Sequence, residues 1–399
     1  MIARKVNISE VIVMLVERTA QILIGWDEDL AETLRVFTEV QNEISYVCFN
    51  NGEPLSALAL HKKVYHKVKG RLNAQMTCTA IRLTAGAYVS AKHNGHEITK
   101  PFRFKKPYAL FLVGKRGRDA DFRMDGKLSI WTIRGRKKLS YRIPDYFKQY
   151  FERAVLIDSI TVKIKKGKLI GYVSLKIDVK EAKPIHTIGV DLNETNAVVA
   201  VNQDNDVLFI TGLQRRMLNK RTFKTIKRLQ RKLARKKAEG SNTRSVVRAL
   251  KRLQGKIARR TRDFCHTAAK RLVGWCPENC VIVFEKLKFG QGKRGSKAWN
   301  RRFHQWPRGQ IVRFVEYKVQ GKGVVDFVDA KGTSITCSMC GLKGIRKRHS
   351  FFCPNCGFMH ADINAAINIR NRYAVLRDGG LLSTSPKASP GGKPPTGGS

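Results

Sequence analysis

Two Cys-x-x-Cys pairs near the C-terminal end constrain the fold of this chain more than any other stretch. The four cysteines are Cys337, Cys340, Cys353 and Cys356, with twelve residues between the pairs. Each pair can present two thiolates to one point, and four thiolates satisfy a tetrahedral zinc ion. Gly341 and Gly357 follow the pairs, where a knuckle turn often requires a positive φ. Two disulfides or a redox Cys-x-x-Cys are the rival interpretations, but this spacing favours one structural Zn²⁺ in a ribbon over residues 332–357.

The charge of the chain is extreme. It has 77 Lys and Arg against 31 Asp and Glu over 399 residues, a formal net charge of +46. Such self-repulsion costs stability unless a polyanion neutralises it, so we expect a large nucleic-acid partner. We find no membrane-spanning run and no signal peptide, and therefore expect a cytoplasmic protein without a membrane partner.

Five cysteines remain outside the two pairs, and an odd remainder favours a reducing compartment. Cys276 and Cys280, with His266 near them in the sequence, could form a second metal site. The alternative, which we favour, is that they are small core residues.

The N-terminal half predicts helices inserted into a β-barrel. Residues 1–8 alternate as in a strand, and the stretch that follows, up to Trp26, is ambiguous between helix and strand. Residues 27–91 show helical periodicity in three segments, one of them with Leu58, Leu60 and Val64 on its face. From about residue 101 to 180, short strands with a hairpin turn at 165–167 indicate a small antiparallel barrel, which the first strand could close.

A second domain is expected from about residue 184. Three strands precede a helical hairpin over 212–275, which contains 22 Lys or Arg against two acidic residues. Such an excess cannot be paired internally, so we interpret the hairpin as a phosphate-binding element. Its predicted inner faces are formed by Leu213, Met217, Ile226, Leu229 and Leu233 on one arm and by Val247, Leu250, Leu253 and Ile257 on the other. The chain then continues with a strand up to Glu285, a basic loop over 290–306, a helix over 308–320 and a further strand, which precede the zinc element. After the zinc element we expect a helix over 362–375 and a disordered tail.

Three acidic residues share one context. Asp191 ends the apolar strand TIGVD, Glu285 ends VIVFE, and Asp362 opens a helix directly after the zinc element. A single acid of this kind could be a helix cap or a salt-bridge partner. Three converging carboxylates suit Mg²⁺ or Mn²⁺, and two such ions about 4 Å apart can catalyse phosphodiester cleavage.

The segments around the three acids resemble the motifs of a known nuclease domain. GVDLNETNAVVAV, VIVFEKL and DINAAINI resemble the three motifs of a RuvC nuclease domain, which has an RNase H-like fold. The zinc ribbon directly before the third acid, with TSITCSMCG ahead of it, is similar to that of the TnpB family, the transposon-encoded ancestors of type V CRISPR effectors. The stretch LHKKVYHKVKGRLNAQMTCTAIRLTAGAY resembles the recognition helices that this family inserts into a wedge barrel, so the resemblance extends to about residue 376.

The resemblance implies a mixed α/β multidomain chain with an RNase H-like RuvC domain and a zinc-ribbon insertion. The expected parts are a wedge barrel (1–26 and 93–183), a helical recognition domain (27–92), the RuvC domain (184–331 and 358–376), the zinc ribbon (332–357) and the tail (377–399). It also implies that Asp191, Glu285 and Asp362 are catalytic acids that hold two Mg²⁺ or Mn²⁺ ions, and that Asn364 orients a ligand or caps the helix.

The family binds a guide RNA, recognises a short adjacent motif in double-stranded target DNA and cleaves both strands with one site. The residues expected to contact nucleic acid on this basis are Tyr65, Gln75, Arg346 and Arg348. The expected assembly is a monomeric ribonucleoprotein at the nucleoid of a prokaryote. Asn193 and Glu194 stand where many relatives carry a small glycine-containing turn, which leaves the positioning of the metal ions open. A compact type V CRISPR effector and a nuclease-inactive RNA-guided repressor are the alternative functions; the retention of all three acids disfavours the second.

Overall fold

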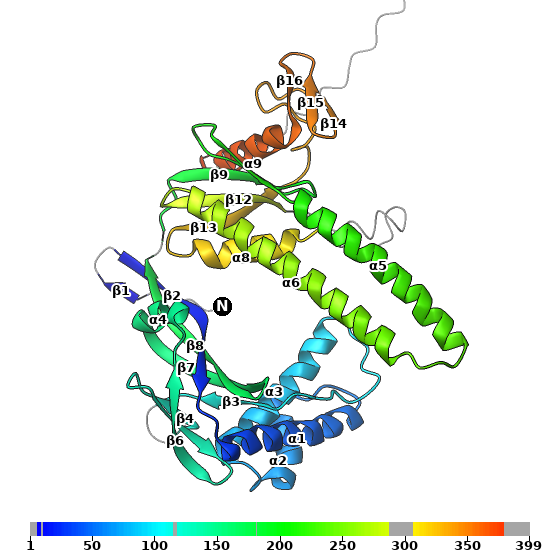
Figure 1. Ribbon diagram of the computed structural model, residues 1–399. Helices are drawn as coiled ribbons and strands as arrows, with labels where there is room; N and C mark the ends of the chain where they lie inside the picture. Colours follow the sequence, from blue (N-terminus) through cyan, green and yellow to red (C-terminus); the bar gives the residue numbers. More distant parts are fainter. Residues whose placement is uncertain (1–5, 9–10, 115–117, 181, 287–305, 379–399) are drawn as a thin grey trace, which may run out of the picture. The chain divides into compact units, whose positions relative to one another are not determined.

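The computed structural model describes residues 6–8, 11–114, 118–180, 182–286 and 306–378 (Figure 1). The chain divides into two compact units, 1–180 and 181–399. The expected basic loop over 290–306 and almost all of the expected disordered tail lie outside the described residues. The finer domain bounds stay a prediction. No helix in the described part of the chain has the length and hydrophobicity that are needed to cross a membrane.

One strongly paired sheet organises the first unit. Its order is β3-β7-β8-β2-β6-β5-β4, and β1 pairs with β2 at the side. The strands are β1 (Val6–Ile8), β2 (Val11–Ile24), β3 (Tyr108–Leu112), β4 (Ala120–Phe122), β5 (Lys127–Thr132), β6 (Gly135–Arg142), β7 (Ala154–Lys165) and β8 (Lys168–Lys180). The ambiguous stretch before Trp26 is therefore a strand. Lys166 and Gly167, at φ 52° and 70°, form the predicted hairpin turn between β7 and β8.

The two edge strands of this sheet meet. An isolated bridge joins Val113, just after β3, to Ala120 in β4, and the Gly114 amide donates to the Ala120 carbonyl at 3.3 Å. The sheet is thus nearly closed, which confirms the predicted barrel. The prediction that the first strand closes it was wrong, because β1 pairs with β2 at the side of the sheet, while the bridge between the edges involves β3 and β4.

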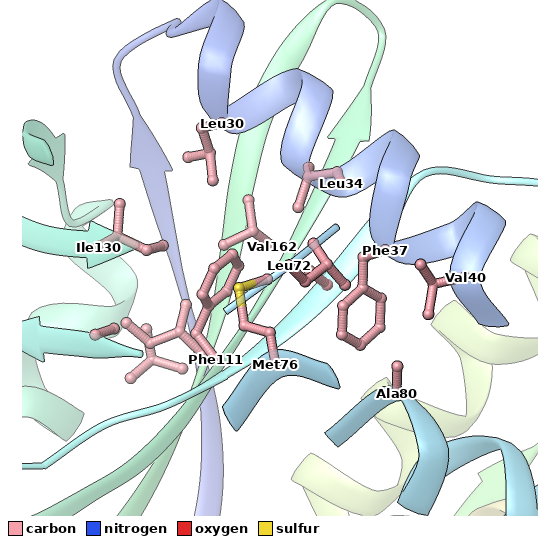
Figure 2. Close-up of a cluster of buried hydrophobic side chains, with 14 of the residues drawn as sticks. Leu30, Leu34, Phe37, Val40, Leu72, Met76, Ala80, Phe111, Ile130 and Val162 are labelled. Atoms are coloured by element: carbon pink, nitrogen blue, oxygen red, sulfur yellow. The ribbon is translucent and has the colours of Figure 1, made fainter. Parts of the chain in front are cut away.

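Three helices pack against this sheet. They are α1 (Glu28–Asn50), α2 (Ala57–Val68) and α3 (Ala74–His93), and a short α4 (Asp145–Glu152) follows the strand β6. Asp27, Ser56 and Asn73 cap the first three by accepting a hydrogen bond from the backbone amide three residues later. Figure 2 shows side chains of α1 facing Phe111 of β3 and Val162 of β7, so the helices and the barrel share one hydrophobic core. Leu58 was wrongly placed on the inner face of α2, since it is exposed. Leu60 and Val64, predicted on the same face, are buried, and Val68 is buried with them.

A five-stranded sheet forms the centre of the second unit, in the order β11-β10-β9-β12-β13. The strands are β9 (His186–Asp191), β10 (Asn196–Val201), β11 (Val207–Thr211), β12 (Cys280–Lys286) and β13 (Gly323–Asp329). β10 is antiparallel to both β9 and β11, whereas β9, β12 and β13 are parallel. The ends of β9 and β12 therefore lie at the same edge of the sheet.

Helices cover both faces of this sheet. α6 (Arg244–Trp275) and α8 (Arg308–Val319) share a core with one face, and α9 (Ala361–Asp378) packs on the other, against β9 above all (Figure 1). Gly189 makes this approach possible. A Cβ at Gly189 would lie 2.1 Å from the Ala366 carbonyl oxygen, so any side chain there would push α9 off the sheet.

The basic hairpin consists of α5 (Leu213–Ala238) and the N-terminal part of α6. Its small core contains Ile226, Val246 and Leu250. Leu213 and Met217 were wrongly assigned to the inner face, since both are exposed. Arg215 and Asn219 are buried there instead, and Asn219 Oδ1 accepts a hydrogen bond from Arg260 of α6 at 3.0 Å.

A small three-stranded sheet stands between β13 and α9. Its antiparallel strands are β14 (Ile345–Lys347), β15 (Ser350–Cys353) and β16 (Gly357–His360), in that order. Because β16 runs directly into α9, the position of this ribbon determines where α9 begins.

Candidate functional site

Asp191 is the last residue of β9, at the centre of the five-stranded sheet. Its side chain is only 6% exposed. Burial, together with the nearby carboxylates of Glu285 and Asp362, raises the pKa of Asp191 to about 7. The Asn193 amide donates a hydrogen bond to Asp191 Oδ2 at 3.4 Å.

Glu285 lies beside Asp191 because β12 is parallel to β9 and Phe284 pairs with Val190. Burial raises the pKa of Glu285, and a hydrogen bond from the Thr333 hydroxyl to Glu285 Oε1 opposes that rise. The Arg308 guanidinium donates to the backbone carbonyl of Glu285. Thr333 therefore orients the carboxylate, and Arg308 holds the end of the strand.

Asp362 is the second residue of α9 and is fully buried. It accepts three hydrogen bonds: from the Asn196 amide at 2.8 Å, from Arg346 Nη2 at 2.6 Å and from His349 Nδ1 at 3.2 Å. The helix N-terminus also favours a negative charge at this position.

The structure thus brings together the three predicted acids from two strand ends and one helix start. They lie close enough for the charges of Glu285 and Asp362 to raise the pKa of Asp191. Carboxylate oxygens are the ligands that Mg²⁺ and Mn²⁺ prefer, and burial of Asp191 and Asp362 beside the half-buried Glu285 makes further positive charge favourable. The donor set therefore fits a hard divalent cation.

The four residues expected to contact nucleic acid lie in different places. Arg346 forms an ion pair with Asp362. Arg348 is exposed at the β14–β15 turn, where its φ is 55°, and its backbone carbonyl accepts a hydrogen bond from Arg346 Nε. Tyr65 in α2 is half-buried and stacks on His61, and Gln75 at the start of α3 is exposed. Their roles toward nucleic acid stay a prediction.

The four ribbon cysteines form one cluster whose sulfur atoms lie within 4.8 Å of one another. Cys340 and Cys353, one from each pair, have their sulfur atoms 3.4 Å apart. Gly341 and Gly357 have φ of 77° and 76°, as the knuckle turns require. A cluster of this geometry is compatible with a structural zinc ion.

Asn364 binds the segment around the first cysteine pair. Its Oδ1 accepts from the Ser338 amide at 2.7 Å, and its Nδ2 donates to the Thr336 carbonyl at 2.8 Å. Its expected role in orienting a ligand stays a prediction. Asn368, one turn later, donates to the carbonyls of Thr333 and Thr336. The two asparagines therefore fasten the first cysteine knuckle to α9.

Sequence reasoning missed Asn196, Thr333, His349 and Asn368. The i, i+4 spacing of Asn364 and Asn368 in DINAAINI was an available signal, because two amides on one helix face indicate a shared partner. Asn196 and Thr333 gave no signal, since only the folded chain brings them to the acids. Asn193, in the turn that departs from the family, accepts from the amides of Thr195 and Asn196 and so shapes the turn without glycine.

The favoured interpretation of Cys276 and Cys280, as small core residues rather than a second metal site, is confirmed. Both cysteines are buried in the core of the second unit, and His266 instead stacks on Phe314, with ring centroids 3.8 Å apart. Among the described residues, the other group with suitable ligand spacing is His349, His360 and Asp362, which includes one of the three acids.

Two family models match the chain. The model described as "Probable transposase" matches residues 159–294, which contain Asp191 and Glu285. The model described as "Cas12f1-like, TNB domain" matches residues 309–369, which contain the ribbon and Asp362. No curated protein matches significantly.

Several solved structures are similar. Cas12f1 in a complex with sgRNA and target DNA is 17% identical with a TM-score of 0.58, covering 87% of this chain and 84% of that one. CasPhi-2 (Cas12j) bound to crRNA is 12% identical with a TM-score of 0.46, covering 89% and 98%. C2c1 of Alicyclobacillus acidoterrestris with single-guide RNA is 10% identical with a TM-score of 0.41, covering 86% and 66%. The first of these confirms the predicted fold class: a mixed α/β chain with a RuvC-type domain, a nearly closed barrel and a zinc-ribbon-like element.

Proposed function

The chain is TnpB-like, and from this premise we propose that it is an RNA-guided DNA endonuclease. It would bind a guide RNA, recognise a short adjacent motif in duplex DNA, and hydrolyse phosphodiester bonds in both strands at one site. Asp191, Glu285 and Asp362 are the proposed catalytic acids.

One observation carries this proposal: two buried carboxylates and one half-buried carboxylate, 171 positions apart along the chain at their extremes, meet at one edge of a single sheet. Burying uncompensated carboxylates costs stability, so a fold that gathers three of them has a reason other than stability to keep them. A cluster of hard oxygen ligands in a strongly cationic protein fits metal-assisted cleavage of a nucleic acid.

The three acids would hold magnesium or manganese ions, which supply an activated water and stabilise the leaving oxygen when bound. The chain's own residues prepare this site. Asn196 fixes one oxygen of Asp362, and Thr333 fixes one oxygen of Glu285. Arg346, which lies in the ribbon strand β14, pairs with Asp362 and offsets its negative charge, so the ribbon contributes to the electrostatics of the site.

The partners are proposed from charge and from the neighbours. The similar structures are complexes with guide RNA, in some cases with target DNA. A net charge of +46, with 22 basic residues in the 212–275 hairpin, provides cationic surface for dozens of phosphates. The ribbon cysteines would bind one structural zinc ion, and the protein would work at the nucleoid of a prokaryotic cell.

The test is guided cleavage. The protein is purified with the RNA that accompanies it, that RNA is sequenced, and plasmid DNA carrying the matching target is offered with Mg²⁺. Wild type should cut the plasmid, and Asp191→Asn should lose at least about 10³-fold in rate, since a metal-binding carboxylate cannot be replaced by an amide. Asp206→Asn, an exposed acid in the β10–β11 turn, is the matched control and should cut normally.

Two results would overturn the proposal. If Asp191→Asn cuts like wild type, the acids are not catalytic. If wild type binds the guided target but cuts with neither Mg²⁺ nor Mn²⁺, the protein is an RNA-guided repressor. A co-purified RNA that contains CRISPR repeats would instead identify a compact type V effector, with the same chemistry and another guide.

A further inference from the structure

The turn between β9 and β10 holds two of the three acids through amide side chains. Asn193 donates a hydrogen bond to Asp191 Oδ2 at 3.4 Å, and Asn196 donates one to Asp362 Oδ2 at 2.8 Å. Asn193 Oδ1 accepts from the backbone amides of Thr195 and Asn196, at 2.9 and 2.7 Å. The oxygen of Asn193 is therefore occupied within the turn, and its NH₂ group is the part that can face the acid. The shape of this turn determines where both amides lie.

An irregularity at the start of β10 directs Asn196 to the acids. The pairing with β11 shifts between Asn196 and Val198, so Ala197 is an extra residue in β10. Ala197 and Val198 both lie in the core that α6 and α8 cover, although neighbours on a regular strand face opposite sides. Asn196 instead reaches Asp362 of α9, which packs on the other face of the sheet. A regular strand would place Asn196 on the same side as Val198, so the bulge redirects this side chain.

The start of α5 holds this turn in place. The Gly212 amide, directly before α5, donates to the Thr195 carbonyl at 2.8 Å. Arg216 Nη1 donates to the Thr195 hydroxyl at 3.4 Å, and Arg216 Nε lies 3.3 Å from Glu194 Oε1. One guanidinium therefore contacts two consecutive residues of the turn. Because its donors form a planar fork, the two contacts restrict the turn more than a single contact could.

Stability alone does not explain the pair of Glu194 and Arg216. Their side chains are 27% and 38% exposed, so water screens the attraction between them and the pair contributes little to the stability of the fold. Glu194 also adds a negative charge three residues after Asp191, where other acids already gather. Arg216 offsets this charge and fixes the turn at the same time. The geometry of the turn is therefore the main effect of the pair.

We propose that Glu194 and Arg216 are positioning residues for the acid site: together they fix the β9–β10 turn, and the turn holds Asp191 and Asp362 in the arrangement that binds divalent cations. The two residues do not touch the cations themselves and act through the two asparagine amides. The proposal rests on the proposed function, since it concerns the metal affinity of the same acids. It also gives α5 a role besides phosphate contacts, because its first turn supports the acid site.

The experiment measures Mn²⁺ binding by the full-length protein freed of RNA, from the loss of the free-ion signal in electron paramagnetic resonance. Arg216→Gln should weaken Mn²⁺ binding about tenfold, as expected when a group that orients metal ligands is removed. Loss of a positive charge alone would have the opposite effect, since the remaining negative charges would attract the cation more strongly. The direction of the change therefore separates positioning from charge.

Glu194→Gln is the second variant, and it leaves the cationic surface of α5 intact. It should also weaken Mn²⁺ binding about tenfold. The double variant should bind no more weakly than either single variant, because both changes break the same contact. Glu278→Gln is the matched control: Glu278 pairs with Lys322 at 3.8 Å at the opposite edge of the same sheet, and its loss should leave Mn²⁺ affinity unchanged.

Guided plasmid cleavage by the protein with its RNA gives a second measurement. Both single variants should need about ten times more Mn²⁺ for half of the maximal rate, and should approach the wild-type rate when Mn²⁺ saturates. The affinity of Glu194→Gln for the guided target should be unchanged. The Tm of both variants without Mn²⁺ should stay close to that of wild type, because a partly exposed ion pair contributes little to stability.

Unchanged or tighter Mn²⁺ binding in Arg216→Gln would overturn the proposal. So would loss of Mn²⁺ binding in Glu194→Gln alone, which would make Glu194 a metal ligand, or an equal loss in Glu278→Gln. A large fall in Tm would show that the pair mainly stabilises the fold. If wild type cuts the guided target and both variants bind Mn²⁺ normally, only the positioning role fails. If both variants bind Mn²⁺ weakly while wild type does not cut, only the proposed function fails.

Discussion

At the residue scale, burial of the Asp191 carboxyl costs stability and leaves a group that can bind a cation. The carboxyl is almost fully buried, and its pKa of about 7 reflects burial first and the neighbouring carboxylates of Glu285 and Asp362 second. Without a cation, this group prefers to be protonated near neutral pH. The same property makes Asp191 ready to bind a divalent cation, which favours the ionised form.

This property predicts a pH-dependent stability. Between pH 3.8 and about 7, folded Asp191 holds a proton that the unfolded chain has released. The free energy of unfolding therefore falls as pH rises through this window, by several kcal/mol at most. Asp191→Asn should remove this loss, so without added Mg²⁺ its Tm at pH 8 should exceed that of wild type by several degrees, and the difference should shrink toward pH 4.

Thermal unfolding at several pH values checks this prediction, with the zinc content kept constant and Asp206→Asn as the exposed control. Added Mg²⁺ should raise the Tm of wild type and not that of Asp191→Asn, because only wild type keeps the full ligand set. A variant Tm at or below that of wild type at pH 8 would contradict the argument.

α9 is the element on which the site depends. Its first turn carries Asp362, Asn364 fastens the cysteine knuckle, and the packing of Ala366 on Gly189 sets its distance from the sheet. One helix thus connects an acid, the ribbon and the central strand. Mutations in these contacts should affect the site without touching an acid.

Gly189→Ala tests the close approach of α9. The new Cβ would lie 2.1 Å from the Ala366 carbonyl oxygen and 2.7 Å from Arg370 Cβ, so the helix must move. We expect a loss of about 3 kcal/mol or more in denaturant unfolding. Gly274→Ala in α6 is the matched control, since nothing lies within 4 Å of the added Cβ; it should be neutral or stabilise by up to about 1 kcal/mol. Equal effects of the two changes would show that α9 does not rest on Gly189.

Mutations should separate the role of the ribbon from that of Asp362, the acid that follows it. Cys353→Ser removes one of four clustered sulfur atoms, and we expect loss of bound zinc, a lower Tm and weaker binding of the guided target. Asp362→Asn should retain zinc and binding and lose cleavage. Metal analysis, thermal unfolding and binding measured on both variants check this division, and an identical defect in both would rule it out.

At the scale of the whole molecule, charge dominates. The chain carries an excess of 46 positive charges, and the α5–α6 hairpin contributes far more than its share with only a small apolar core of its own. An element of this kind gains little from intramolecular packing. Its long basic surfaces are instead explained by phosphate contacts.

The salt dependence of RNA binding tests this role. Replacing the exposed Arg228, Arg231 and Lys232 of α5 by Ala should reduce the slope of log affinity against log salt by up to about 3. The control replaces Arg35, Lys92 and Lys148, each already paired with an acidic side chain, and should change the slope little. An unchanged slope in the α5 variant would remove the hairpin from the binding surface.

Much of the architecture follows from local patterns. Apolar runs in TIGVD and VIVFE, helical periodicity over residues 27–91 and two glycines after the cysteine pairs are local features, and local backbone preferences are what a sequence displays directly. They predicted the strands, the helices, the cysteine cluster and the three acids. Leu58, Leu213 and Met217 are exposed although the pattern predicted them to be buried. Burial at these positions depends on which side of the helix a neighbouring element covers.

By itself, the sequence determined which residues could do chemistry: three strand-end and helix-start acids, four cysteines and a cationic hairpin. Only the tertiary structure decided which polar groups hold those acids. Asn196, Thr333, Arg346 and His349 reach them from segments distant in sequence. The same holds for the ribbon sheet, where Phe351 is buried and Phe358 is exposed, because which side of a three-stranded sheet is covered depends on what packs against it. Such contacts have no local signature, since they form only when long-range pairing closes the chain on itself.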